Sequence, residues 1–150
     1  MKKILLAILL ASFSYAQSYT FIVKKYDKEI ELESKIIGEI ANSSVKNKVI
    51  LYIPKITEIE KKVYSKYFTI GKTCAESNFI FEKKNVDEVQ CGIKNKLFFT
   101  NNYKKLLSDT KYFGAFFWSK SRPNIVFVEN RLAKYNISLP SSYKQFIEDL

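Results

Sequence analysis

The stretch over residues 96–140 constrains the fold of this chain more than any other segment. It holds three apolar runs, at 97–100, 112–119 and 125–128, which are separated by polar residues. The middle run is apolar at alternate positions on both faces, so we expect a strand that is covered on both sides. Regular alternation would place Phe113, Ala115 and Phe117 on one face, and Tyr112, Gly114, Phe116 and Trp118 on the other. The stretch therefore predicts a large part of a sheet that is packed on both faces.

The sequence Ser121-Arg122-Pro123-Asn124 predicts the turn that follows the long run, because Ser, Pro and Asn are common turn residues. The run at 125–128 would then return antiparallel and complete a β-hairpin. We expect a helix over residues 103–109, with Asn101 or Asn102 as its N-cap. Two further helices are expected over residues 129–135 and 141–150.

Upstream of this stretch, helical and strand patterns alternate. Apolar spacings of three, four and seven predict an amphipathic helix over residues 28–44, whereas residues 19–27 fit either an extension of it or a short strand. The apolar run at 49–53 predicts a central parallel strand. Short strands are expected at 68–70 and 79–81, and a turn of helix at 74–77. A helix is expected over 56–67, with an apolar stripe made of Ile56, Ile59, Val63 and Tyr67.

This alternation is typical of a sheet with helices on both faces. Parallel strands need crossover connections, which the intervening helices provide, and only the final hairpin would make the sheet mixed. We therefore predict an α/β fold, a three-layer α/β/α domain with a mostly parallel mixed sheet ending in a β-hairpin.

The first 16 residues have the features of a secretory signal peptide. Lys2 and Lys3 precede a short apolar run, and Ser14-Tyr15-Ala16 fits the small-x-small cleavage site. The alternative is an uncleaved membrane anchor, but the run is too short to span a bilayer. We expect cleavage near Ala16, no stable membrane insertion afterwards, and a single periplasmic domain over residues 17–150.

The basic charge does not indicate a nucleic-acid partner. Removing residues 1–16 leaves 23 basic and 15 acidic residues, a net charge of +8. Only Arg122 and Arg131 are arginine, and the lysines are scattered among acidic residues. Nucleic-acid binders usually cluster their positive charge and interleave it with aromatic platforms. A solvated basic surface is the simpler interpretation.

The chain contains no histidine. Nucleophile activation by a histidine base is therefore excluded, as is every metal site that needs a histidine ligand. The carboxylates lie in charged surface stretches and suggest no acid/base pair. We expect no enzymatic activity, no metal and no cofactor.

Cys74 and Cys91 are the two cysteines of the chain. An even number of cysteines in an exported protein favours a disulfide, which would stabilise the fold by about 3 kcal/mol. The alternative is a pair of buried free thiols. A catalytic redox pair is disfavoured, because the spacing is far from that of a C-x-x-C motif.

Trp118, Lys120 and Arg122 form the candidate binding surface. The guanidinium group of Arg122 could hold a carboxylate or a phosphate, and Trp118 lies near a strand end, where partial exposure suits a partner. The simpler alternatives are a solvated turn, an arginine paired with a nearby acid, and an aromatic side chain that belongs to the core.

From Cys74 onward, the order of features resembles the YfiR-like (HmsC-like) family of small exported bacterial proteins. The resemblance rests on TCAESNFIF, CGIKNK, LFFTNNYKKLL and FGAFFWSKSRPNIVFV, followed by ENRLAKYNISLPSSYKQFI. It implies a periplasmic α/β protein that is disulfide-bonded, often dimeric and not catalytic. It further implies binding to the periplasmic sensor domain of a membrane diguanylate cyclase, which is thereby held inactive.

Two functions are therefore expected from different classes. The first is a periplasmic regulator that binds a membrane signalling protein, with a homodimer as a further partner. The second is a small solute-binding module that captures an anionic ligand through Arg122.

Overall fold

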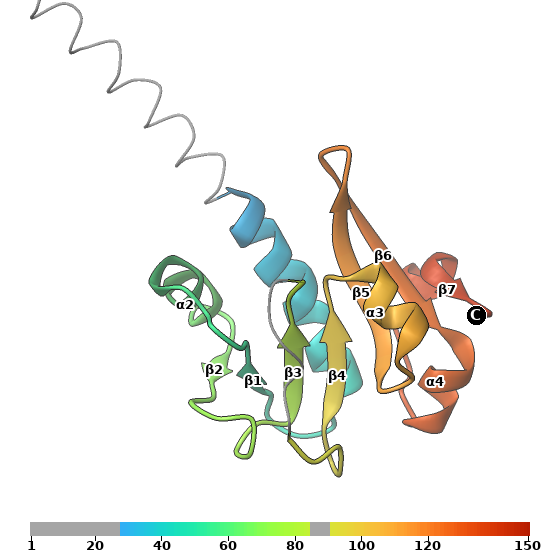
Figure 1. Ribbon diagram of the computed structural model, residues 1–150, viewed down its shortest axis with the longest axis horizontal. Helices are drawn as coiled ribbons and strands as arrows, with labels where there is room; N and C mark the ends of the chain where they lie inside the picture. Colours follow the sequence, from blue (N-terminus) through green and yellow to red (C-terminus); the bar gives the residue numbers. More distant parts are fainter. Residues whose placement is uncertain (1–27, 85–90) are drawn as a thin grey trace, which may run out of the picture.

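The computed structural model describes residues 28–84 and 91–150. The seven strands form one sheet in the order β2-β1-β3-β4-β5-β6-β7 (Figure 1). In chain order, the elements are a helix at residues 28–44, β1 (Ile50–Tyr52), α2 (Glu58–Tyr64), β2 (Thr69–Ile70), β3 (Phe79–Glu82), β4 (Leu97–Thr100), α3 (Tyr103–Ser108), β5 (Tyr112–Ser119), β6 (Arg122–Val128), α4 (Glu129–Lys134), the 3-10 helix η1 (Ser141–Phe146) and β7 (Ile147–Glu148).

The predicted fold class is confirmed. Strands β2, β1, β3, β4 and β5 run parallel, β5 and β6 form an antiparallel hairpin, and β7 is parallel to β6. The sheet is therefore mostly parallel and mixed. The predicted signal peptide and the choice between helix and strand at 19–27 lie outside the described residues. Among the described residues, no helix is long and apolar enough to cross a membrane.

One face of the sheet is covered by helix 28–44, α2 and η1. The predicted stripe of helix 28–44 is confirmed, since Ile37 and Ile40 are fully buried against this face. These helices pack against phenylalanines of the central strands. The ring centroids of two of them, Phe99 and Phe113, lie 5.2 Å apart. Burial of each such side chain stabilises the fold by about 1.5 to 3 kcal/mol.

The predicted apolar stripe of α2 is wrong at two of its four residues, although Ile56 and Val63 pack against the core as expected. Ile59 and Tyr67 are 46% and 39% exposed, whereas Glu60 and Tyr64 are buried. Thr57 and Glu60 form a capping box that starts the helix at Glu58. The Tyr64 hydroxyl donates to the Glu33 carboxylate at 2.6 Å, so a buried polar pair, not apolar spacing, orients the helix.

The second face is covered by α3 and by the disulfide-linked segments. Asn102 is the N-cap of α3, since its side chain accepts from the backbone N–H groups of Lys104 and Lys105. At the other end, Nη1 of buried Arg131 lies 2.7 Å from the Leu106 carbonyl oxygen and 2.8 Å from that of Tyr112. One of the two arginines therefore ties the end of α3 to the start of β5.

Regular alternation along β5 is also wrong, because the strand contains a bulge. Phe98 of β4 pairs with Tyr112, but Phe99 pairs with Gly114. The extra residue shifts the faces, so one core cluster contains Phe113, Phe116 and Trp118, and the other contains Tyr112, Ala115 and Phe117. A Cβ on Gly114 would lie 2.7 Å from the Val126 carbonyl oxygen, which explains the glycine.

The hairpin turn lies two residues earlier than predicted. Ser119 pairs with Arg122, so Lys120 and Ser121 form a two-residue turn, with φ of 49° and 61°. Such a left-handed turn matches the twist of the flanking strands, which outweighs the preference of Pro for a turn. Pro123 belongs to β6, opposite Trp118.

Two further helical predictions are wrong, the turn of helix at 74–77 and part of the helix at 141–150. Residues 74–77 form a turn without helix. Of the predicted helix at 141–150, residues 141–146 form the 3-10 helix η1, and residues 147–148 form strand β7, which extends the sheet beside β6. The change follows the burial of Tyr143, whose ring packs edge-on against Phe127 at 5.7 Å between centroids.

Candidate functional site

The β5–β6 hairpin projects beyond the rest of the sheet. The last β4–β5 pair is Thr100 with Ala115, but β5 continues to pair with β6 as far as Ser119 (Figure 1). The tip therefore extends past the carboxyl ends of the parallel strands. Ligands of open α/β sheets usually bind at this edge.

The structure separates the three predicted surface residues. Trp118 faces the helix 28–44 side, is half-buried and packs edge-on against Phe116 with ring centroids 5.8 Å apart. Arg122 pairs with Ser119, so alternation puts it on the opposite face of the hairpin. Lys120 and Arg122 are brought together, whereas Trp118 belongs to the core of the first face.

A concavity of about 410 Å³ lies at the tip. Its lining consists of Ser119, Lys120, Arg122 and Asn124. The Asn124 side-chain amide donates to the Arg122 carbonyl oxygen at 3.0 Å, which fixes the amide beside the guanidinium-bearing residue. We call these four residues the hairpin-tip site.

An aromatic pair lies beside the hairpin-tip site on the same face. Phe117 pairs with Asn124 across the hairpin, and its ring contacts that of Tyr103 at 5.5 Å between centroids. Both rings are half-buried. The sequence did not indicate Tyr103 as a site residue, because α3 brings Tyr103 to β5 only in the folded chain.

The cations of the hairpin-tip site have no acidic partner among the described residues. Lys120 and Arg122 are exposed, and neither forms an ion pair within that part of the chain. A guanidinium group can hold a carboxylate by two parallel hydrogen bonds. The site is therefore suited to bind an anionic group next to an aromatic surface.

A buried ionic cluster that sequence reasoning missed joins helix 28–44, α2 and the end of β3. The Lys83 ammonium group lies 2.8 Å from the Glu33 carboxylate and 2.6 Å from the Glu60 carboxylate. Burial alone would lower the pKa of Lys83, but these two carboxylates raise it above its ordinary value. Burial, and then the charge of Glu33, raises the pKa of Tyr64.

A second missed cluster surrounds Glu82 on the opposite face of the sheet. Glu82 is fully buried and ends β3, one residue beyond the strand expected at 79–81. The Tyr112 hydroxyl donates to its carboxylate, and the ammonium groups of Lys111 and Lys105 lie 3.4 and 3.6 Å from it. The charged residues Glu82 and Lys83 at the end of a buried strand were the available signal for these two clusters. Successive side chains of a strand point to opposite faces, so neighbouring charges can pair on different sides of the sheet.

Cys74 and Cys91 form the predicted disulfide, with Cα atoms 6.1 Å apart. The two free thiols of the alternative are therefore excluded. Cys74 is buried against Ile80 and Phe98, and the bond ties the segment after β2 to the segment before β4. A disulfide at this position is consistent with an oxidising compartment.

Comparison of the chain with protein-family models, curated proteins and solved structures finds no match. The resemblance to the YfiR-like family therefore stays a prediction from the sequence.

Proposed function

We propose that this protein is an exported, non-catalytic regulator that binds the periplasmic sensor domain of a membrane signalling protein, such as a diguanylate cyclase. The observation that carries the proposal is the hairpin-tip site, which presents Lys120 and Arg122 beyond the edge of the sheet. The class of partner comes from the YfiR-like resemblance.

The interior charges favour a binding role over catalysis. Each of the buried carboxylates Glu33, Glu60 and Glu82 forms an ion pair with a lysine. Paired groups of this kind hold elements together and are poorly placed to exchange protons with a substrate. Lys120 and Arg122 of the hairpin-tip site, by contrast, are exposed and form no ion pair with any described residue.

The partner surface should be acidic with an adjacent apolar group. A carboxylate would lie against Arg122, while an apolar side chain would cover the half-buried rings of Phe117 and Tyr103. The positive net charge would also accelerate encounter with an acidic domain.

The direct test is capture of the partner by cross-linking in the intact periplasm. We expect the double variant Lys120→Glu/Arg122→Glu to reduce the yield of the complex by about tenfold, because it reverses both charges of the contact. The matched control is Lys46→Glu/Lys48→Glu, which makes the same charge change on an exposed loop far from the hairpin. Equal yields from the two double variants would contradict the proposal, and recovery of only the protein itself would indicate a homodimer.

The concavity at the hairpin tip supports one alternative, a solute-binding module for a small anionic ligand. That function predicts a higher thermal midpoint with a small organic acid such as citrate, and loss of this increase in Arg122→Ala. A regulator that uses the same residues for a protein contact would show no such increase.

A further inference from the structure

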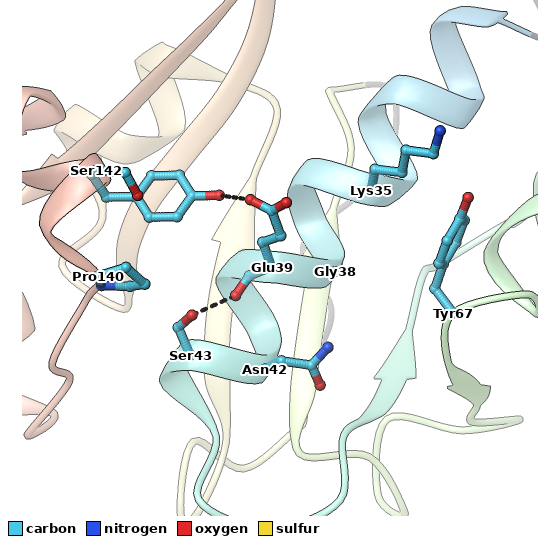
Figure 2. A pocket seen from close by; sticks show the side chains of 9 residues that line it. Lys35, Gly38, Glu39, Asn42, Ser43, Tyr67, Pro140 and Ser142 are labelled. Carbon is cyan, nitrogen blue, oxygen red and sulfur yellow. Dashed lines mark hydrogen bonds between the residues drawn. The ribbon is translucent and has the colours of Figure 1, made fainter.

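A second concavity lies on the opposite side of the sheet from the hairpin-tip site. It is a groove of about 550 Å³ across the outer surface of helix 28–44 (Figure 2). Tyr67 forms one side, and the segment around η1 forms the other. The lining residues are Lys35, Gly38, Glu39, Asn42, Ser43, Tyr67, Pro140, Ser142 and Tyr143. Its volume lies within the usual range of small-molecule sites, about 300 to 1,000 Å³.

The side of the groove near α2 combines an aromatic ring with polar side chains. Tyr67 lies between α2 and β2 in the chain, and 39% of its surface is exposed beside the groove. In Figure 2, Lys35 and Asn42 point from the helix toward the side where Tyr67 lies, with Gly38 between them. A Cβ on Gly38 would lie 3.5 Å from the ring of buried Phe68, so the helix backbone and this ring form the floor of the groove between Lys35 and Asn42.

The opposite side holds a fixed carboxylate. The Tyr143 hydroxyl donates to the Glu39 carboxylate at 2.7 Å, and the Ser43 hydroxyl donates to the Glu39 carbonyl oxygen at 2.7 Å (Figure 2). Burial, and then the hydrogen bond to Glu39, raises the pKa of Tyr143, so the phenol stays a donor. The Glu39 carboxylate is thereby held in place at the groove.

The chemistry of the lining selects a neutral ligand. Both charged side chains of the lining already have a partner, since the Lys35 ammonium lies 3.7 Å from the Glu31 carboxylate and Glu39 accepts the hydrogen bond of Tyr143, in contrast to the purely basic hairpin tip. Within the described residues, the side chains of Asn42 and Ser142 make no hydrogen bond, so both can serve a ligand. An amide, a hydroxyl, an ammonium and a carboxylate together offer both donors and acceptors.

We propose that this groove binds a neutral carbohydrate. A sugar ring has an apolar C–H face, which would pack on the Tyr67 ring, and a hydroxyl edge, which would exchange hydrogen bonds with Asn42 and Glu39. The inference rests on the groove alone and does not depend on the regulatory function proposed above.

The test is a titration of the purified protein with two neutral disaccharides, cellobiose and N,N′-diacetylchitobiose, followed by amide chemical shifts. We expect saturable shifts at Gly38 and Asn42 with at least one of them. Tyr67→Ala and Asn42→Ala should each weaken binding by about tenfold, the loss of one good contact, whereas Tyr67→Phe should retain it. Leu107→Ala, at an exposed apolar position on α3, is the matched control and should leave the affinity unchanged.

Three results would overturn the inference. The first is the absence of saturable shifts with both disaccharides. The second is a set of shifts that persists unchanged in Tyr67→Ala and Asn42→Ala. The third is a set of shifts centred on the hairpin-tip site. If Tyr67→Ala fails to fold, Asn42→Ala still tests the inference, because the Asn42 side chain is exposed and its removal leaves the core intact.

Discussion

Glu82 and Lys83 show how adjacent residues can stabilise both faces of a sheet. At the end of β3, Glu82 is paired with lysines near α3, while Lys83 is paired with Glu33 and Glu60 on the other face. The partners of Lys83 lie 50 and 23 residues away in the sequence. Such distant pairs are invisible to local pattern analysis, so this part of the structure could not be predicted.

Replacement of Lys83 by methionine should be strongly destabilising. Methionine is unbranched and only one heavy atom shorter than lysine, but it leaves the buried Glu33 and Glu60 carboxylates without their cation. We expect a loss of about 3 to 5 kcal/mol in the free energy of unfolding, measured by urea denaturation. The control is Lys62→Met on the exposed side of α2. Similar losses of unfolding free energy in both variants would contradict a stabilising role of the buried cluster.

The Glu60 carboxylate should make stability depend on pH in the acid range. Burial alone would raise its pKa, but hydrogen bonds from Lys83 and from the Thr57 backbone lower it below the ordinary value of 4.5. The unfolded chain therefore takes up the proton first, so the stabilisation is complete above pH 4.5 and is lost as the pH falls through the folded pKa. Urea midpoints measured across this range should fall less steeply in Glu60→Gln than in the wild type. Parallel curves would contradict the assignment.

The β5–β6 hairpin is the element that defines both the sheet and the hairpin-tip site. Its bulge redirects Trp118 into the core, and its two-residue turn places Arg122 on the opposite face. The bulge depends on the close approach of Gly114 to Phe99 and Val126. The geometry of the candidate site is therefore set by a glycine remote from the tip.

Gly114→Ala should disturb this geometry. The added Cβ would lie 2.6 Å from the Phe99 ring and 2.7 Å from the Val126 carbonyl oxygen, which is closer than atoms can approach. We expect destabilisation by about 1 to 3 kcal/mol, the usual cost of overpacking. Gly92→Ala is the matched control, because a Cβ there has no atom within 4 Å. Equal thermal midpoints for the two variants would refute this role of Gly114.

Prediction from the sequence succeeded where one signal was strong and failed where two competed. The strand Leu97–Thr100 and helix 28–44 were predicted because apolar runs and periodicity were unambiguous. The α2 stripe was wrong at Ile59 and Tyr67 because Tyr64, whose hydroxyl donates to Glu33, is buried instead. The turn failed because strand twist outweighed the preference of Pro123, and that twist is a property of the assembled sheet. For the candidate site, Lys120 and Arg122 were found, whereas Tyr103 and Phe117 become neighbours only through packing.

At the scale of the whole molecule, the two faces of the sheet are held in different ways. Helix 28–44, α2 and η1 cover one face, whereas a single short helix and the Cys74–Cys91 disulfide secure the other. The covalent bond holds its segments against Ile80 and Phe98 where fewer helices contribute apolar contacts. Stability should therefore depend on the redox state of the solution.

Cys74→Ser should lower the free energy of unfolding by about 3 kcal/mol under oxidising conditions, because the unfolded chain loses its cross-link. Cys91→Ser should have a similar effect. Addition of dithiothreitol should bring the wild type to the level of the variants, whose own thermal midpoints should not change. A wild-type midpoint that is insensitive to both the substitution and the reductant would contradict the role of the disulfide.

The most direct test of the proposed regulatory function is photo-cross-linking in living cells with a photoreactive amino acid placed at position 122 or, as control, at position 46. We expect a specific cross-link from position 122 to a membrane protein with a periplasmic domain, and none from position 46. We further expect competition by an excess of wild-type protein but not of the Lys120→Glu/Arg122→Glu variant. The same products from both positions, or no product from position 122, would contradict the claim that the hairpin tip is the binding surface.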